Sequence, residues 1–244
     1  MSGILAALVG GGINTFTLNI TGLVNPNIQS LATAQGWLGK IQPIIIVNTG
    51  QVNTLDIPAS MDGADITLDL SNASFVGGLR NGGTAIKTRA HIKIKNAGTI
   101  AGGGGQGGSG GTANVQFRAP EYVPAVGWGY GGSGGNGQGF APGSLSITAA
   151  QPGSDGTDSG TVYGYKDGGS FGGGPDYAQA TGGTGGNGGA WGAAGTSGGS
   201  GTTSGDGYYG GSDPGSAGQA GGKAIDGNSY ITWIMTGSRI GSIT

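Results

Sequence analysis

The chain contains no cysteine and a single histidine, and both shortages limit the chemistry that it can perform. Without cysteine there is neither a disulfide framework nor a Cys-ligated metal site. With His91 alone, a histidine-based catalytic triad or metal cluster is not expected. Charged residues are also scarce, at 9 %, and the formal net charge is −2. We therefore predict no nucleic-acid partner and no attraction to an anionic membrane.

Long apolar runs and catalytic motifs are absent as well. The run from Ile4 to Val9 is too short to span a bilayer and has no basic residue before it, so neither membrane insertion nor a signal peptide is predicted. Matches to the dinucleotide-binding pattern at 105–110 and 127–132 are expected by chance in so glycine-rich a sequence. The close carboxylates Asp155 and Asp158 are interpreted as solvated loop residues. We predict no enzyme, no catalytic residue, no metal and no cofactor.

What the sequence does contain is glycine, at 62 of 244 residues, and most of it lies in one region. Residues 102–222 hold 45 of the 62 glycines, whereas both flanks have ordinary patterning. This change in composition predicts three parts. Residues 1–40 form an N-terminal attachment segment, 41–101 plus 223–244 a β-rich base, and 102–222 a glycine-rich bundle.

The flanks are typical of β structure with little helix. Strands are predicted at Thr15–Ile20, Ile44–Val47, Ile66–Leu70, Ile86–Lys95 and Ser229–Met235, because apolar and polar residues alternate or β-branched residues cluster there. The last of these strands must pair with strands before residue 101. A short helix is predicted at Ile28–Leu38, with an apolar face that serves either the core or attachment to a larger assembly. That face consists of Leu31, Ala34, Trp37 and Leu38.

The strand at Ile86–Lys95 has a basic outer face. Lys87, Arg89, His91, Lys93 and Lys95 alternate with the apolar residues. This face is either a patch for an acidic partner or a solvated face paired with aspartates of neighbouring strands. We favour the second alternative, and the aspartates that it involves are Asp56, Asp62, Asp65 and Asp69.

Within the bundle, glycine recurs at every third residue. Unbroken series run from Gly183 to Gly201, from Gly102 to Gly111, from Gly129 to Gly135 and from Gly215 to Gly221. A period of three matches the polyproline II geometry of three residues per turn, so every third residue lies on one face. Glycine faces let neighbouring chains approach and exchange backbone hydrogen bonds. The sequence predicts a bundle of polyglycine II helices rather than collagen or disorder. Collagen is not favoured because the nine prolines lie mostly outside the glycine runs.

Other segments interrupt the glycine series at 112–126, 140–166, 175–181 and 202–209, and these are predicted to be turns at the two ends of the bundle. They contain most of the aromatic residues, which are either binding residues on a rigid scaffold or apolar plugs that cap the bundle. As receptor-binding candidates we take Arg118, Tyr122, Tyr130, Phe140, Tyr163, Tyr165, Phe171, Tyr177, Tyr208 and Tyr209.

The junctions of the glycine region carry a recognisable pattern. The region opens with Asn96–Gly105 and closes with Gly221–Gly227, which is followed by Tyr230–Trp233. Residues 80–244 resemble the glycine-rich distal ends of tailed-phage fibre and tail-tip proteins, in the layout of the adhesins that cap the long tail fibres of T-even-like phages. The resemblance implies a sandwich of polyglycine II helices, an N-terminal part docked on a tail or fibre protein, and distal loops that bind a host receptor.

The predicted function is that of a virion adhesin at a tail or fibre tip. Its partner at the host cell surface would be a bacterial outer-membrane protein or a surface glycan. Two other functions are weighed against this one, and each has a distinguishing feature. A structural tail-tip assembly protein would not bind a receptor, and an ice-binding polyglycine II protein would present flat faces of small residues rather than aromatic loops.

Overall fold

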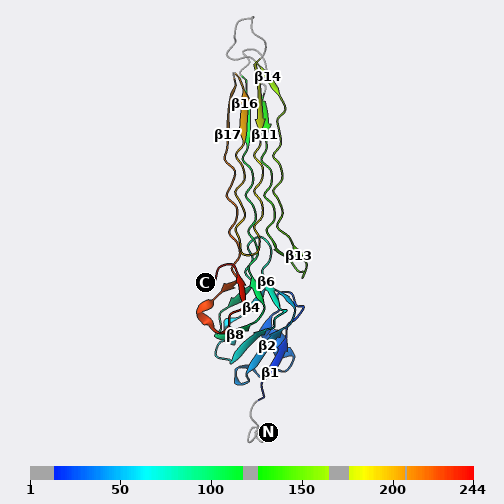
Figure 1. Ribbon diagram of the computed structural model, residues 1–244, viewed down its shortest axis with the longest axis vertical. Coiled ribbons are helices and arrows are strands. Elements are labelled where there is room, and N and C mark those ends of the chain that lie inside the picture. The colour runs from blue at the N-terminus through cyan, green and yellow to red at the C-terminus, as the bar shows by residue number, and fades with distance from the viewer. Residues whose placement is uncertain (1–13, 118–125, 165–175, 207) are drawn as a thin grey trace, which may run out of the picture.

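The computed structural model describes residues 14–117, 126–164, 176–206 and 208–244, and its parts form an elongated molecule (Figure 1). We name three parts. The base comprises residues 14–101 and 223–244, the shaft comprises six glycine-rich runs between 102 and 222, and the distal head is the pair of small sheets at the far end of the shaft. Within the described residues there is one α-helix, so the predicted mainly β class is confirmed.

The base is a parallel β-solenoid with three faces. Three successive circuits of the chain each add one strand to each of three all-parallel sheets. The circuit before them adds one strand to the first sheet, and the circuit after them adds one strand to each of the first two sheets. The first sheet contains β1 (Phe16–Asn19), β2 (Ile44–Asn48), β5 (Ile66–Leu70), β8 (Ile92–Asn96) and β19 (Ile231–Met235). The second contains β3 (Gln51–Asn53), β6 (Phe75–Gly77), β9 (Thr99–Ala101) and β20 (Ser238–Ile240). The third contains β4 (Leu55–Ile57), β7 (Ile86–Thr88) and β18 (Ile225–Asp226).

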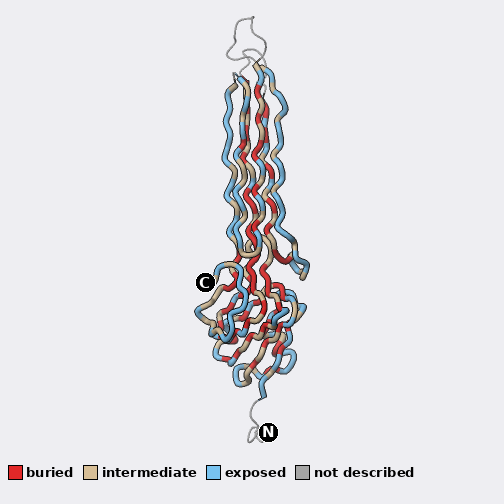
Figure 2. The backbone as a smooth tube through the Cα atoms, in the orientation of Figure 1, coloured by how far each residue is buried: buried red, intermediate tan, exposed pale blue. Residues whose placement is uncertain are grey.

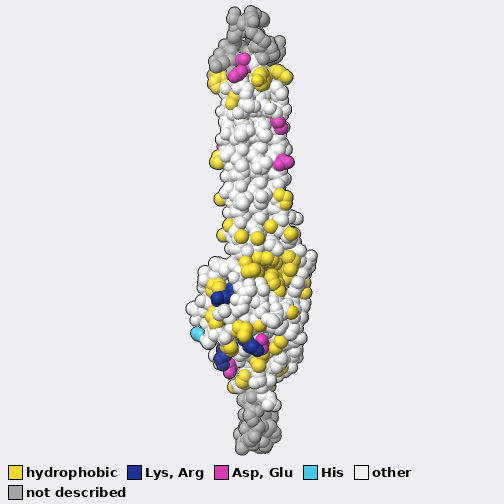
Figure 3. Space-filling view, viewed as in Figure 1, with side chains coloured by type: hydrophobic (Ala, Val, Ile, Leu, Met, Phe, Trp, Pro, Cys, Tyr) yellow, Lys and Arg dark blue, Asp and Glu magenta, His cyan; other side chains and the backbone are white. Residues whose placement is uncertain are grey.

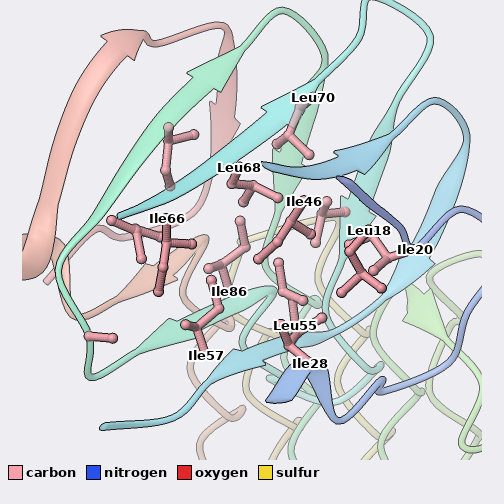
Figure 4. Packing of buried hydrophobic residues seen from close by; sticks show 14 of the residues in the cluster. Leu18, Ile20, Ile28, Ile46, Leu55, Ile57, Ile66, Leu68, Leu70 and Ile86 are labelled. Atoms are coloured by element: carbon pink, nitrogen blue, oxygen red, sulfur yellow. The ribbon is translucent and has the colours of Figure 1, made fainter. Parts of the chain in front are cut away.

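The solenoid core consists of apolar side chains stacked in register. Leu18, Ile46, Leu68 and Ile94 are direct neighbours across successive strands of the first sheet, and all four are fully buried (Figure 4). Similar columns line the other two faces, namely Val52, Val76 and Ile100 on one and Leu55, Ile86 and Ile225 on the other. Because burial of one such side chain stabilises a fold by about 1.5–3 kcal/mol, these columns are the main source of stability in the base.

The shaft is an insertion into one circuit of this solenoid. The chain leaves the base after β9 and returns before β18, which pairs with β7 as the third strand of the same circuit. A further circuit follows, in which β19 pairs with β8 and β20 with β9. The prediction that the terminal strand pairs with strands before residue 101 is confirmed.

The alternation at Ile86–Lys95 is correct, but the prediction of one continuous strand is wrong. The chain forms β7 and β8 on two different faces, with a corner at residues 89–91. Ala90 is buried at this corner, so inward and outward residues continue to alternate around the turn. On the outer face His91, Lys93 and Lys95 pair with Asp62, Asp65 and Asp69 at 2.8–3.2 Å. The favoured interpretation of a solvated, paired face is confirmed for these three pairs, whereas Arg89 pairs with Asp226 rather than with one of the four predicted aspartates.

Residues 14–40, part of the predicted attachment segment, form the first part of the base. β1 extends the first sheet, and α1 (Ile28–Ala34) buries Ile28 and Ala32. The helix is shorter than predicted because Gly36, at φ +99°, stops it. Of the predicted apolar face Trp37 is buried, whereas Leu38 is 64 % exposed. Short 3-10 helices occur at Gly39–Ile41, Ala59–Met61 and Asn228–Tyr230.

The shaft consists of six extended runs that alternate in direction between the base and the distal head. They span residues 102–112, 130–138, 149–157, 182–190, 193–201 and 213–222, and backbone hydrogen bonds join neighbouring runs at every third residue. Gly105, Gly108 and Gly111 donate to the carbonyls of Ala193, Thr196 and Gly199 at 2.8–2.9 Å. The central runs are the buried ones (Figure 2). The shaft is thus held by backbone contacts rather than by an apolar core.

Glycine is required in the shaft because carbonyl groups lie where side chains would be. A Cβ on Gly108 would overlap the carbonyl oxygen of Ser216, and one on Gly186 would overlap that of Thr196. In the fourth run Gly182 and Gly183 are buried and Thr184 is exposed, as expected for two glycine faces and one outer face. In the edge runs at 149–157, 193–201 and 213–222 mainly one residue in three is partly buried, and most of the others are exposed.

The prediction of one long turn at 140–166 is wrong, because residues 149–157 form a run of the shaft. Residues 151, 154 and 157 bond to both the second and the fourth run. The true turn is shorter and lies beside the base, where β12 (Gly139–Phe140) pairs with β13 (Ile147–Thr148). Gly153 and Gly156, three residues apart, indicate this run in the sequence. Two glycines among polar residues and next to Pro152 are equally typical of a loop, so the sequence did not distinguish the two structures.

The distal head contains two small antiparallel sheets. One has the order β11 (Val126–Gly129), β10 (Ala113–Gln116), β17 (Tyr209–Ser212), and the other β14 (Val162–Gly164), β15 (Asp176–Thr181), β16 (Thr202–Gly205). Ala113, Val115, Phe117, Ala178 and Ala180 are buried between them. Parts of the predicted turns are therefore strands, and the shaft ends in a small apolar core of its own.

Candidate functional site

The distal head gathers the chain connections that carry most of the candidate residues. Residues 118–125 join β10 to β11, residues 165–175 join β14 to β15, and residue 207 lies between β16 and β17. These segments lie outside the described residues, and so do four of the candidates, Arg118, Tyr122, Tyr165 and Phe171. The six strands from which they start and to which they return all belong to the distal head, at the end of the shaft remote from the base (Figure 1).

Four candidate tyrosines expose their rings on or beside the distal head. Tyr163 and Tyr177 are direct cross-strand partners, with 64 % and 54 % of their surface exposed. Tyr130 is 59 % exposed where the second run begins, and Tyr209 is 40 % exposed on β17. Cross-strand partners lie on the same face of a sheet, so Tyr163 and Tyr177 form one aromatic surface. Hydrophobic side chains gather on the surface at the distal end of the shaft, as they also do where the shaft meets the base (Figure 3).

Tyr208 and Phe140 are less accessible than the other candidates. Tyr208 is half-buried against the small core of the head, and its hydroxyl lies 2.7 Å from the Thr203 hydroxyl oxygen. Phe140 is fully buried at the opposite end, where its ring makes edge contacts with Phe75 and Trp191 at centroid distances of 5.9 and 6.0 Å. Phe140 is therefore a plug between shaft and base, and its burial corrects its placement in an exposed loop.

Two exposed apolar residues of the head were not among the candidates. Trp128 is 51 % exposed and Val126 is 43 % exposed, both on β11. Gly127, which lies between them, and Gly129, which follows Trp128, are both buried. Glycines of this strand therefore point inward and alternate with large residues that point outward. That alternation from 126 to 130 was the signal that could have identified them.

The acidic residues that the structure describes at the head do not form a metal site. Asp158 accepts a hydrogen bond from the Gly160 amide at 2.9 Å and also contacts the Gln179 side chain. Asp155 lies on the outer side of the shaft and, like Asp158, is exposed. Across the described residues, no three His, Asp or Glu side chains come close enough to hold a metal ion. In the same residues no helix is long and apolar enough to cross a membrane.

Two ion pairs meet on one carboxylate where the shaft returns to the base. A 2.7 Å ion pair with Arg89 and a 3.1 Å pair with Lys223 lower the pKa of Asp226 to about 2. The same contact raises the pKa of Arg89. The Asp226 carboxylate thereby joins the corner after β7 to the end of the last run. Its role is to fix the shaft on the base, far from the exposed tyrosines.

A narrow shaft that presents exposed aromatic rings at one end is the geometry of an attachment protein. A sequence profile described as "Phage tail fibre adhesin Gp38" matches residues 15–244, and the chain belongs to this family. Membership places the protein on the tail fibre of a phage virion, where it acts at the surface of the host cell. Comparisons with curated proteins and with solved structures gave no match.

Proposed function

We propose that the protein binds a receptor on the host cell, either an outer-membrane protein or a surface glycan, through the distal head and the connections that it carries. The observation that supports this proposal most is the common position of these connections. They belong to strands of one small domain at the end of a long shaft, beside exposed tyrosines. The residues proposed to contact the receptor are Arg118, Tyr122, Tyr130, Tyr163, Tyr165, Phe171, Tyr177, Tyr208 and Tyr209.

We also propose that the six runs of the shaft are polyglycine II helices. Two observations support this proposal, namely the hydrogen bonds at every third residue and the outward position of the third residue in triplets such as Gly185-Gly186-Asn187. A helix with three residues per turn has both properties. Such a shaft is a stiff spacer, because every run is bonded to its neighbours along its whole length. Its function is to hold the head away from the fibre.

The N-terminal part is proposed to attach the protein to a tail or fibre protein. The first circuit of the solenoid supports this assignment, since among the described residues β1 pairs with one strand, β2, and it lies at the end of the base away from the shaft (Figure 1). An edge strand offers unpaired N–H and C=O groups to another β structure. The base and the head would then bind fibre and host at opposite ends of one molecule.

Binding to cells tests the receptor proposal. Purified protein should bind susceptible bacteria and block adsorption of the phage, and exchange of residues 118–125 and 165–175 for those of a relative should change which cells are bound. Thermal stability should not change, because the buried residues of the head remain in place. A matched control is Pro142→Ser in the exposed turn beside the base.

The outcomes separate receptor binding from assembly. If the protein neither binds susceptible cells nor competes with the phage while it remains folded, the receptor proposal is wrong and a structural role in the tail tip is favoured. If Pro142→Ser impairs binding as much as the loop exchanges do, the head is not the contact surface.

A further inference from the structure

The outer face of the sheet β11–β10–β17 combines exposed aromatic side chains with uncharged polar side chains. Residues of β10 alternate, with Ala113 and Val115 buried inward and Asn114 and Gln116 outward. Cross-strand partners share a face, so the register gives two outward rows. One row is Trp128–Asn114–Gly211 and the other is Val126–Gln116–Tyr209. We name these six residues the lateral platform.

The lateral platform is a shallow surface with raised edges. Trp128 stands on one outer strand and Tyr209 on the other, two strand spacings and two residues along the strand apart, which is about 12 Å. Gly211 leaves a gap in the first row, since a Cβ on it would meet nothing within 4 Å. The Asn114 side chain lies in the middle and accepts a hydrogen bond from the Gly211 amide at 3.1 Å, which fixes the plane of its carboxamide group. These dimensions suit one or two pyranose rings.

The chemistry of the lateral platform favours a neutral sugar. No residue of β10, β11 or β17 carries a formal charge, so neither a phosphate group nor an acidic or basic peptide finds a partner on these strands. Exposed indole and phenol rings stack on the C–H faces of sugar rings. Carboxamide groups both donate and accept hydrogen bonds, as a row of hydroxyl groups requires. Rigid aromatic side chains also lose little entropy on binding.

We propose that the lateral platform binds the neutral portion of a host surface polysaccharide, as a site separate from the connections that the head carries. This inference rests on the proposed function, because it assumes that the distal head reaches the cell surface. The platform is the outer face of a sheet on the side of the head, where a long flexible polysaccharide can lie beside it.

Two substitutions test the platform without disturbing the fold. Trp128→Ala removes the exposed indole, and Gly211→Val fills the gap in the first row with a β-branched residue that strands favour. A Cβ at the neighbouring Gly210 would overlap the Asn114 carbonyl, so the choice of Gly211 is specific. Ile147→Ala is the matched control, since it removes an apolar side chain that is 41 % exposed but lies beside the base.

The probe is the polysaccharide released from a susceptible host by mild acid and freed of lipid and protein. Titration calorimetry should give binding to the wild-type protein, about tenfold weaker binding for Trp128→Ala and for Gly211→Val, and unchanged binding for Ile147→Ala. The proposal is overturned if the wild type does not bind the polysaccharide, or if both platform variants bind it as tightly as the wild type does. It is also overturned if the platform variants lose binding to purified outer-membrane proteins instead. Cell binding by the wild type, measured in parallel, tests the proposed function separately.

Discussion

Replacement of Gly186 by alanine tests whether close backbone contact holds the shaft together. Gly186 is buried in the fourth run, donates to the Gly108 carbonyl at 2.7 Å and accepts from the Gly135 amide at 2.9 Å. An added Cβ would lie closer than 2.5 Å to the carbonyl oxygen of Thr196 and 2.7 Å from that of Ser197. Real Cβ contacts are essentially never below 3.0 Å, so the neighbouring run must move by more than 0.5 Å.

The cost of that movement can be worked out from the bonds that it stretches. The fifth run is joined to the fourth by the Thr196 amide to the Asn187 carbonyl and by the Gly199 amide to the Thr184 carbonyl, at 2.9 and 2.8 Å. Loss of both costs about 2 kcal/mol at about 1 kcal/mol each. Overpacking adds about 1–3 kcal/mol. The total is about 3–5 kcal/mol, and since 1 kcal/mol corresponds to about 2–4 °C in a chain of this size, Gly186→Ala should lower Tm by roughly 6–20 °C.

Differential scanning calorimetry of purified variants gives this measurement. Gly211→Ala is the control, because a Cβ there meets nothing within 4 Å, and we expect its Tm to change by no more than about 2 °C. Gly199→Ala should fall between the two, since its Cβ would lie 3.3 Å from the Thr184 hydroxyl. Equal Tm values for Gly186→Ala and Gly211→Ala would refute the close-packed shaft.

Three further predictions concern the base and the head. Asp226 has a pKa of about 2 in the folded protein against an ordinary pKa of 3.8, so its stabilisation is present above about pH 4 and is lost as the pH falls towards 2. Asp226→Asn should therefore lower the free energy of unfolding by about 1–2 kcal/mol at pH 7, after allowance for solvent screening, and by progressively less below pH 4 in urea titrations. Phe140→Ala should cost about 3–5 kcal/mol in the same assay, because it leaves a cavity between Phe75 and Trp191. Tyr163→Ala should change stability by less than about 0.5 kcal/mol yet weaken binding to susceptible cells, and a stability loss equal to that of Phe140→Ala would place Tyr163 in the core instead.

Alternation predicted which side chains of the base are buried, but it could not reveal the solenoid. From Ile86 to Ile94 every second residue is inward, as expected. Apolar and polar residues alternate in the same way in a straight strand and around a corner at which the inner residues stay inward. The alternation therefore could not indicate the turn at residues 89–91. The three-faced closure depends on parallel pairing between circuits, and pairing partners are not encoded in any one segment.

In the shaft, the period of three identified the runs that are richest in glycine. It did not give their directions or neighbours, and it missed 149–157, where an edge run needs glycine on mainly one face. At the candidate site, composition found the aromatic residues but could not tell Phe140, which is a buried plug, from Tyr163, which is exposed. Trp128 was missed for the same reason, since exposure depends on the packing of the strand.

Hydrogen exchange tests most directly whether the distal head is the part of the molecule that meets the host. The protein would be measured alone and with envelope vesicles of a susceptible strain. We predict slower exchange on binding in the strands of the distal head, at residues 113–117, 126–130, 162–164, 176–181 and 202–212, and no change in the turn beside the base at 141–148. Protection of that turn or of the base, with the head unaffected, would contradict the account.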